Sequence, residues 1–160
     1  TPSNSSAASD VYKRQLLIIA FAIYKAITTS QLEIKKSVTK VKTKSGLFAS
    51  KIIISLKNKG GPISNVKVID RLPAFTELLP DRFGLLKPAE IKKRSLVWEF
   101  PRLEKAEEII FSYIVYSKVS ILGKLEIPRA IATFINKAGE IKESFSNKVF
   151  ILTDENYSKV

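Results

Sequence analysis

The chain has 160 residues, and its 27 Lys and Arg exceed its 15 Asp and Glu, which gives a formal net charge of +12. It contains no Cys, no His and no Met. Without Cys and His it can form no disulfide, no zinc finger, no Ser-His-Asp triad and no imidazole general base. The length suits one ordinary domain, and we expect no enzyme, no catalytic residue, no cofactor, no metal and no small-molecule substrate.

The chain begins with a stretch that we set aside when predicting the fold. Residues 5–15 read SSAASDVYKRQ. This string resembles the translation of one reading frame of the transposon mosaic-end adapter used in sequencing libraries. We therefore expect residues 1–15 to be an adapter artefact without regular structure. The alternative is a polar, disordered tail.

An apolar run follows over residues 16–24, LLIIAFAIY, and Lys25 comes next. A helix needs roughly 20 apolar residues to cross a membrane, so this run is too short by itself. We expect residues 16–29 to be the C-terminal end of a truncated transmembrane helix that makes the membrane a partner of the chain. The alternative is a short buried helix. The lysines that follow favour a cytoplasmic location for the rest of the chain under the positive-inside rule.

From residue 31 onward the hydrophobic pattern has a period of two, which is typical of half-buried β-strands. The alternating stretches lie at 32–38, 48–57, 66–68, 96–100, 109–115, 130–134 and 145–151. The sequence Lys137-Ala138-Gly139 predicts a hairpin loop in which Gly139 has a positive φ. Residues 74–94 are the longest irregular stretch, with one short strand or a helical turn near 77–83. We predict an all-β, immunoglobulin-like sandwich of about seven strands over residues 31–153, followed by a polar tail over 154–160.

Four motifs occur in order along this part of the chain. They are IIISLKNKG at 52–60, NVKVIDRLP at 65–73, LVWEF at 96–100 with LEKAE and IFSY after it, and IPRA at 127–130 with SNKV at 146–149. Together they resemble the conserved-repeat, immunoglobulin-like domain of unknown function number eleven, which is found in archaeal and bacterial surface and membrane proteins. The resemblance implies a seven-stranded sandwich in a membrane-anchored or secreted architectural protein, without catalysis.

The resemblance also marks positions with structural roles. They are Asn58, Asp70, Pro73, Trp98, Glu107, Tyr113 and Asn147. We expect Asp70 to accept backbone hydrogen bonds at a strand end, and Trp98 to lie in the core with a partner for its indole N–H. Asn58 and Asn147 are expected in turns or at strand ends, where they tolerate left-handed backbone. Ala106 departs from the pattern, which has Gly there, and this puts the turn geometry in question.

Two functions are compatible with this sequence. The first is a structural, adhesive or protein-interaction module of a membrane-anchored cell-surface protein, with other surface domains as partners. The second is a membrane-proximal cytoplasmic domain that binds anionic lipid or an acidic partner. Nucleic acid is not favoured, because the lysines are scattered and the densest basic run, at 92–94, is only three residues long. Lysine and asparagine also form crosslinks in some surface sandwiches, but their presence alone predicts none.

Overall fold

The computed structural model describes residues 5–28, 30–42, 48–117 and 123–153. The chain divides into two units, residues 1–30 and residues 31–160. The predicted tail at 154–160 lies outside the described residues.

The first unit contains one helix, α1 (Ser5–Thr28). It includes residues 5–15, for which we expected no regular structure. These residues contain neither Gly nor Pro, so nothing in their sequence ends a helix. Within the described part of the chain, no helix is both long enough and apolar enough to cross a membrane. The predicted membrane-spanning character of residues 16–29 is therefore unsupported.

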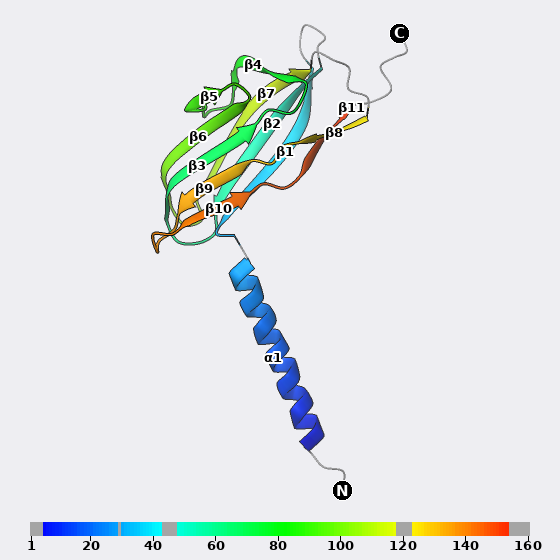
Figure 1. Cartoon of the computed structure of the whole chain (residues 1–160), viewed down its shortest axis with the longest axis vertical. Coiled ribbons are helices and arrows are strands. Elements are labelled where there is room, and N and C mark those ends of the chain that lie inside the picture. The colour runs from blue at the N-terminus through cyan, green and yellow to red at the C-terminus, as the bar shows by residue number, and fades with distance from the viewer. Residues whose placement is uncertain (1–4, 29, 43–47, 118–122, 154–160) are drawn as a thin grey trace. The chain divides into compact units, whose positions relative to one another are not determined.

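The second unit is built from antiparallel β-strands (Figure 1). The strands are β1 (Leu32–Lys42), β2 (Phe48–Asn58), β3 (Ile63–Arg71), β4 (Thr76–Phe83), β5 (Glu90–Lys92), β6 (Ser95–Leu103), β7 (Glu108–Ser117), β8 (Gly123–Ile127), β9 (Ile131–Ile135), β10 (Ile141–Phe145) and β11 (Val149–Thr153). The all-β prediction for this unit is confirmed. The predicted number of about seven strands is too low, because the described residues form eleven.

The strands form three sheets. One sheet has the order β1-β2-β7-β4, a second has the order β10-β9-β3-β6-β5, and β11 pairs with β8 in a third. The predicted irregular stretch at 74–94 contains β4, where a short strand or a helical turn was expected near 77–83, and β5, which the sequence did not predict. Both lie at the edge of a sheet and most of their side chains are exposed or half-buried, so they lack the apolar alternation on which the prediction rests.

The two larger sheets bury their apolar side chains in one common cluster. The largest fully buried side chains include Trp98 on β6, Phe111 and Tyr113 on β7, and Leu32 on β1. The ring centroids of Trp98 and Phe111 are 4.4 Å apart. On β2, β3 and β7 alternate residues face this cluster, as the two-residue period predicts.

Four connections between the described strands contain left-handed backbone, at Phe75, Lys93, Ala106 and Gly139. Gly139 has a φ of 80° between β9 and β10, which confirms the predicted hairpin loop. Ala106 has a φ of 65° between β6 and β7. The chain thus keeps at Ala106 the backbone conformation that glycine adopts most easily.

Candidate functional site

A lysine occupies a core position on the first strand of the β unit. Leu32 and Ile34 face the core from β1, and Lys36 continues this row at the next alternate position. Only 3% of Lys36 is exposed. A side chain that carries an ammonium group therefore takes a place where the pattern calls for an apolar one, and it needs a buried partner.

Two further polar side chains complete the cluster. Asp70 follows Val66 and Val68 in the inward-facing row of β3, and it is fully buried. Tyr113 lies in the inward-facing row of β7 and is also fully buried. Because β3 belongs to the five-stranded sheet while β1 and β7 belong to the four-stranded sheet, this cluster joins the two sheets through polar contacts.

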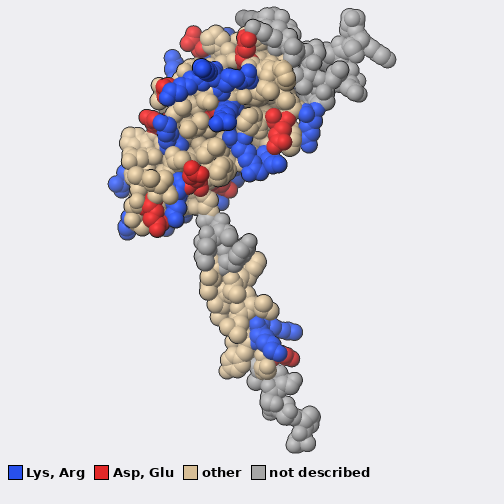
Figure 2. Space-filling view, in the orientation of Figure 1, with Lys and Arg blue, Asp and Glu red and all other residues tan. Residues whose placement is uncertain are grey.

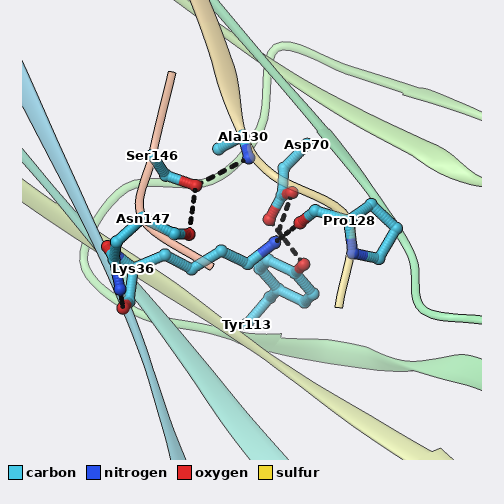
Figure 3. Close-up of polar contacts among 7 residues, drawn as sticks. All are labelled: Lys36, Asp70, Tyr113, Pro128, Ala130, Ser146 and Asn147. Atoms are coloured by element: carbon cyan, nitrogen blue, oxygen red, sulfur yellow. Dashed lines mark hydrogen bonds and ion pairs between the residues drawn. The ribbon is translucent and has the colours of Figure 1, made fainter. Parts of the chain in front are cut away.

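The contacts within the cluster are short and satisfy each polar group (Figure 3). Lys36 Nζ lies 2.6 Å from Asp70 Oδ1 and donates to the carbonyl oxygen of Pro128 at 2.8 Å. The Tyr113 hydroxyl donates to Asp70 Oδ2 at 2.7 Å. Neither the side chain of Lys36 nor that of Asp70 has any solvent-accessible surface. We call Lys36, Asp70 and Tyr113 the buried polar cluster.

Burial moves the ionisable groups of this cluster toward their neutral forms. Loss of hydration lowers the pKa of Lys36, and the attraction of Asp70 opposes that change. Loss of hydration also raises the pKa of Asp70, against the opposing effects of Lys36 and Tyr113. Burial raises the pKa of Tyr113 further above its ordinary value, so its hydroxyl stays protonated and acts as a donor.

Asn147 binds the backbone of the strand that carries this lysine. The backbone N–H of Lys36 donates to Asn147 Oδ1 at 2.8 Å, and Asn147 Nδ2 donates to the Lys36 carbonyl at 3.0 Å. Strand β1 pairs with β2 on one side only. The Asn147 side chain therefore occupies backbone groups that a further strand would otherwise bind. Ser144 adds a hydrogen bond from its hydroxyl to the Leu32 carbonyl.

The remaining predicted positions lie outside the buried polar cluster. Asn58 is fully buried, and its side chain donates to the carbonyls of Leu103 and Glu104 and accepts from the Gly60 N–H. Neither Asn58 nor Asn147 has a positive φ. Asn58 is the last residue of β2 and Asn147 lies between β10 and β11, which are the strand-end and turn positions that the sequence predicts. Their side-chain hydrogen bonds explain these positions.

Pro73, Glu107 and Trp98 do not bind the buried polar cluster through hydrogen bonds. The Pro73 carbonyl accepts from the Thr76 hydroxyl at 2.8 Å. Glu107 Oε2 accepts from a backbone N–H in the turn before β7. Trp98 is buried, its indole N–H donates to a backbone carbonyl at 3.4 Å, and its ring packs against Tyr113 with centroids 6.1 Å apart.

Sequence reasoning overlooked Lys36 and the Pro128 carbonyl. A signal for Lys36 was present, because a polar residue interrupts the alternation between Ile34 and Val38 on an otherwise apolar face. Asp70 interrupts the row of Val66 and Val68 in the same way. Two charges of opposite sign at interior positions of different strands indicate a buried pair. No sequence signal marks the carbonyl of Pro128 as a partner.

Comparison with known proteins gives structural likeness only. No protein-family model matches the chain, and no curated protein matches it. The chain is similar to a GH20 exo-β-N-acetylglucosaminidase from Vibrio harveyi, in complex with N-acetylglucosamine and as an inactive mutant, with a TM-score of 0.49 and 10% identity. It is also similar to the Northeast Structural Genomics Consortium target SoR45, with a TM-score of 0.47 and 8% identity over 78% of this chain and 88% of that chain.

The expectation that this protein is not an enzyme is corrected by this finding, because the chain is similar to part of a glycosidase. The match covers 74% of this chain and 18% of the glycosidase chain. At 10% identity the likeness concerns the course of the backbone. It is no basis for assigning an activity to the buried polar cluster.

Proposed function

We propose that residues 31–153 form an immunoglobulin-like β-sandwich that serves as a structural or adhesive module in a membrane-anchored surface protein. The observation that supports this proposal is the way in which β1 is held. Its backbone pairs with β2 along its whole length, its Lys36 side chain contacts Asp70 of the other large sheet, and Asn147 binds its free side.

A module that transmits tension needs a firmly held first strand, since a pull from the N-terminal side enters the domain there. In β1 such a pull acts on three kinds of contact at once. They are the ladder to β2, the Lys36–Asp70 contact and the two hydrogen bonds of Asn147. Contacts in one network that fail together resist more than their separate contributions suggest.

Force spectroscopy on the full chain, placed between reference domains, tests this proposal. Asn147→Ala is expected to lower the unfolding force, because it removes both hydrogen bonds to β1. Asn136→Ala is the matched control: this asparagine also makes side-chain hydrogen bonds, but within the β9–β10 turn. An equal effect of the two substitutions would contradict the mechanical role of β1.

A second candidate function is attraction to an anionic surface or an acidic partner. Figure 2 shows groups of Lys and Arg side chains spread across the visible face of the β unit, with acidic side chains between them. Several exposed lysines pair with glutamates, as Lys67 does with Glu99 at 2.9 Å. Such pairing weakens the field of the surface, and we therefore place this function second.

Co-sedimentation with vesicles separates the two functions. A lipid-binding domain is expected to sediment with vesicles rich in phosphatidylserine and to be released by salt. Binding that is equal on vesicles of phosphatidylcholine would remove the second candidate.

A further inference from the structure

We infer that Lys36 and Asp70 join to form an intramolecular amide bond between β1 and β3. The inference goes beyond the proposed function, because it concerns the covalent structure of the chain whatever the module does. It starts from the contact of Lys36 Nζ with Asp70 Oδ1 at 2.6 Å, in a place where neither side chain reaches solvent. A nucleophile held against an acyl group in this way reacts as part of one molecule, which raises its effective concentration greatly.

The reaction balances without any further reactant. The lone pair of the neutral Lys36 amine attacks Cγ of the protonated Asp70 carboxyl group, and a C–N bond forms. The C–Oδ1 bond then breaks, and Oδ1 leaves as water with the carboxyl proton and one amine proton. The products are one amide and one water, and no group is oxidised or reduced.

The surroundings fit the reacting groups. Loss of hydration lowers the pKa of Lys36 and raises the pKa of Asp70, which favours the neutral amine and the neutral acid that the step requires. Tyr113 donates to Oδ2, the oxygen that stays on Cγ and carries negative charge after the attack. A donor aimed at such an oxygen stabilises the transition state.

The surroundings also fit the amide that forms. An amide has one N–H donor and one carbonyl acceptor to satisfy when it is buried. The N–H that remains on Nζ has an acceptor in the Pro128 carbonyl, which already lies at 2.8 Å. The carbonyl oxygen derived from Oδ2 keeps the hydrogen bond from Tyr113. A buried ion pair thus becomes a neutral, hydrogen-bonded amide, which costs less to keep away from water.

Asn147 is not the partner of Lys36 in this amide bond, although the composition of the chain would also allow a lysine–asparagine crosslink. Its side-chain amide binds the backbone N–H and carbonyl of Lys36. The acyl group in contact with the amine is that of Asp70. The bond therefore forms with loss of water and not of ammonia.

Intact-mass measurement of the purified full chain tests the inference. The chain is expected to be lighter than its sequence mass by one water molecule. Proteolysis after Lys and Arg is expected to spare Lys36 and to yield a branched peptide that joins the segment containing Lys36 to the segment containing Asp70. The exposed pair Lys67–Glu99, whose atoms lie 2.9 Å apart, is the internal control and is expected to yield no branched peptide.

Substitutions test the roles of the residues. Lys36→Arg and Asp70→Ala are each expected to restore the mass calculated from their own sequence. Tyr113→Phe is expected to slow the appearance of the lighter species about a hundredfold. Tyr116→Phe, on the same strand with a hydroxyl bonded to exposed Glu77, is expected to leave the rate unchanged.

Three results would overturn the inference without reliance on any variant. The first is a folded chain with its full sequence mass. The second is loss of one water without the branched peptide, which would indicate a succinimide at Asp70. The third is equal branching at Lys67 and Glu99, which would indicate random coupling.

Discussion

The left-handed turn at Ala106 leads to a prediction whose sign is opposite to the usual effect of glycine. Ala106 has a φ of 65°, and its backbone N–H donates to the Asn58 carbonyl at 2.8 Å. Left-handed backbone costs a residue with a Cβ atom about 1–2 kcal/mol, and glycine avoids this cost. Glycine also has more conformational freedom to lose on folding, which costs about 0.4–1 kcal/mol relative to alanine.

The difference between these two effects sets the expected magnitude. We expect Ala106→Gly to stabilise the protein by about 0.5–1 kcal/mol. For a chain of this size, each kcal/mol of stabilisation raises the melting temperature by about 2–4 °C. Ala106 is exposed, so loss of its methyl group removes little packing.

Urea denaturation of matched variants measures this effect. Ala138→Gly is the control, because Ala138 lies in the β9–β10 turn, is exposed and has no positive φ. We expect Ala138→Gly to destabilise by about 0.5–1 kcal/mol. If both substitutions destabilise by similar amounts, the strain assigned to Ala106 does not exist and the reasoning fails.

The remaining predictions concern the buried polar cluster, β1 and the core. Tyr113→Phe should lower the free energy of unfolding by at least about 1 kcal/mol more than Tyr116→Phe, because only the Tyr113 hydroxyl donates to a buried carboxyl group. Equal losses for the two variants would refute this. Asn147→Ala should cost about 1–2 kcal/mol and speed hydrogen exchange of the Lys36 amide, and unchanged exchange would contradict the assigned bond. Trp98→Ala should cost about 3–5 kcal/mol in thermal or chemical unfolding, and a cost below about 1 kcal/mol would place this ring outside the core.

The sequence predicts the class of the fold because burial on one face of a strand leaves a two-residue period. This holds for β3, in which Val66 and Val68 face the core and alternate with partly exposed residues. It fails for β5, where Glu90 and Lys92 lie on an exposed edge strand. Such strands form because a neighbour offers backbone partners, and one strand's own sequence does not record that.

The candidate site was predictable in part. Asp70 and Tyr113 were singled out from a resemblance, but nothing local in the sequence shows that they meet. Their contact joins residues that are 43 positions apart, and the contact of Asp70 with Lys36 spans 34 positions. Periodicity places each side chain on a face, whereas the partner across the core depends on how the sheets pack.

The hydrogen bonds between the Asn147 side chain and the Lys36 backbone have a consequence for the synthesis of the chain. The two residues are 111 positions apart, and Asn147 comes close to the end of the domain. A growing chain leaves the ribosome with its first residues ahead, so β1 emerges long before the side chain that covers its free edge. Until then the N–H and carbonyl of Lys36 on that edge are open to pairing with other chains. The β unit can therefore cover this edge of β1 only after nearly all of the domain has been translated.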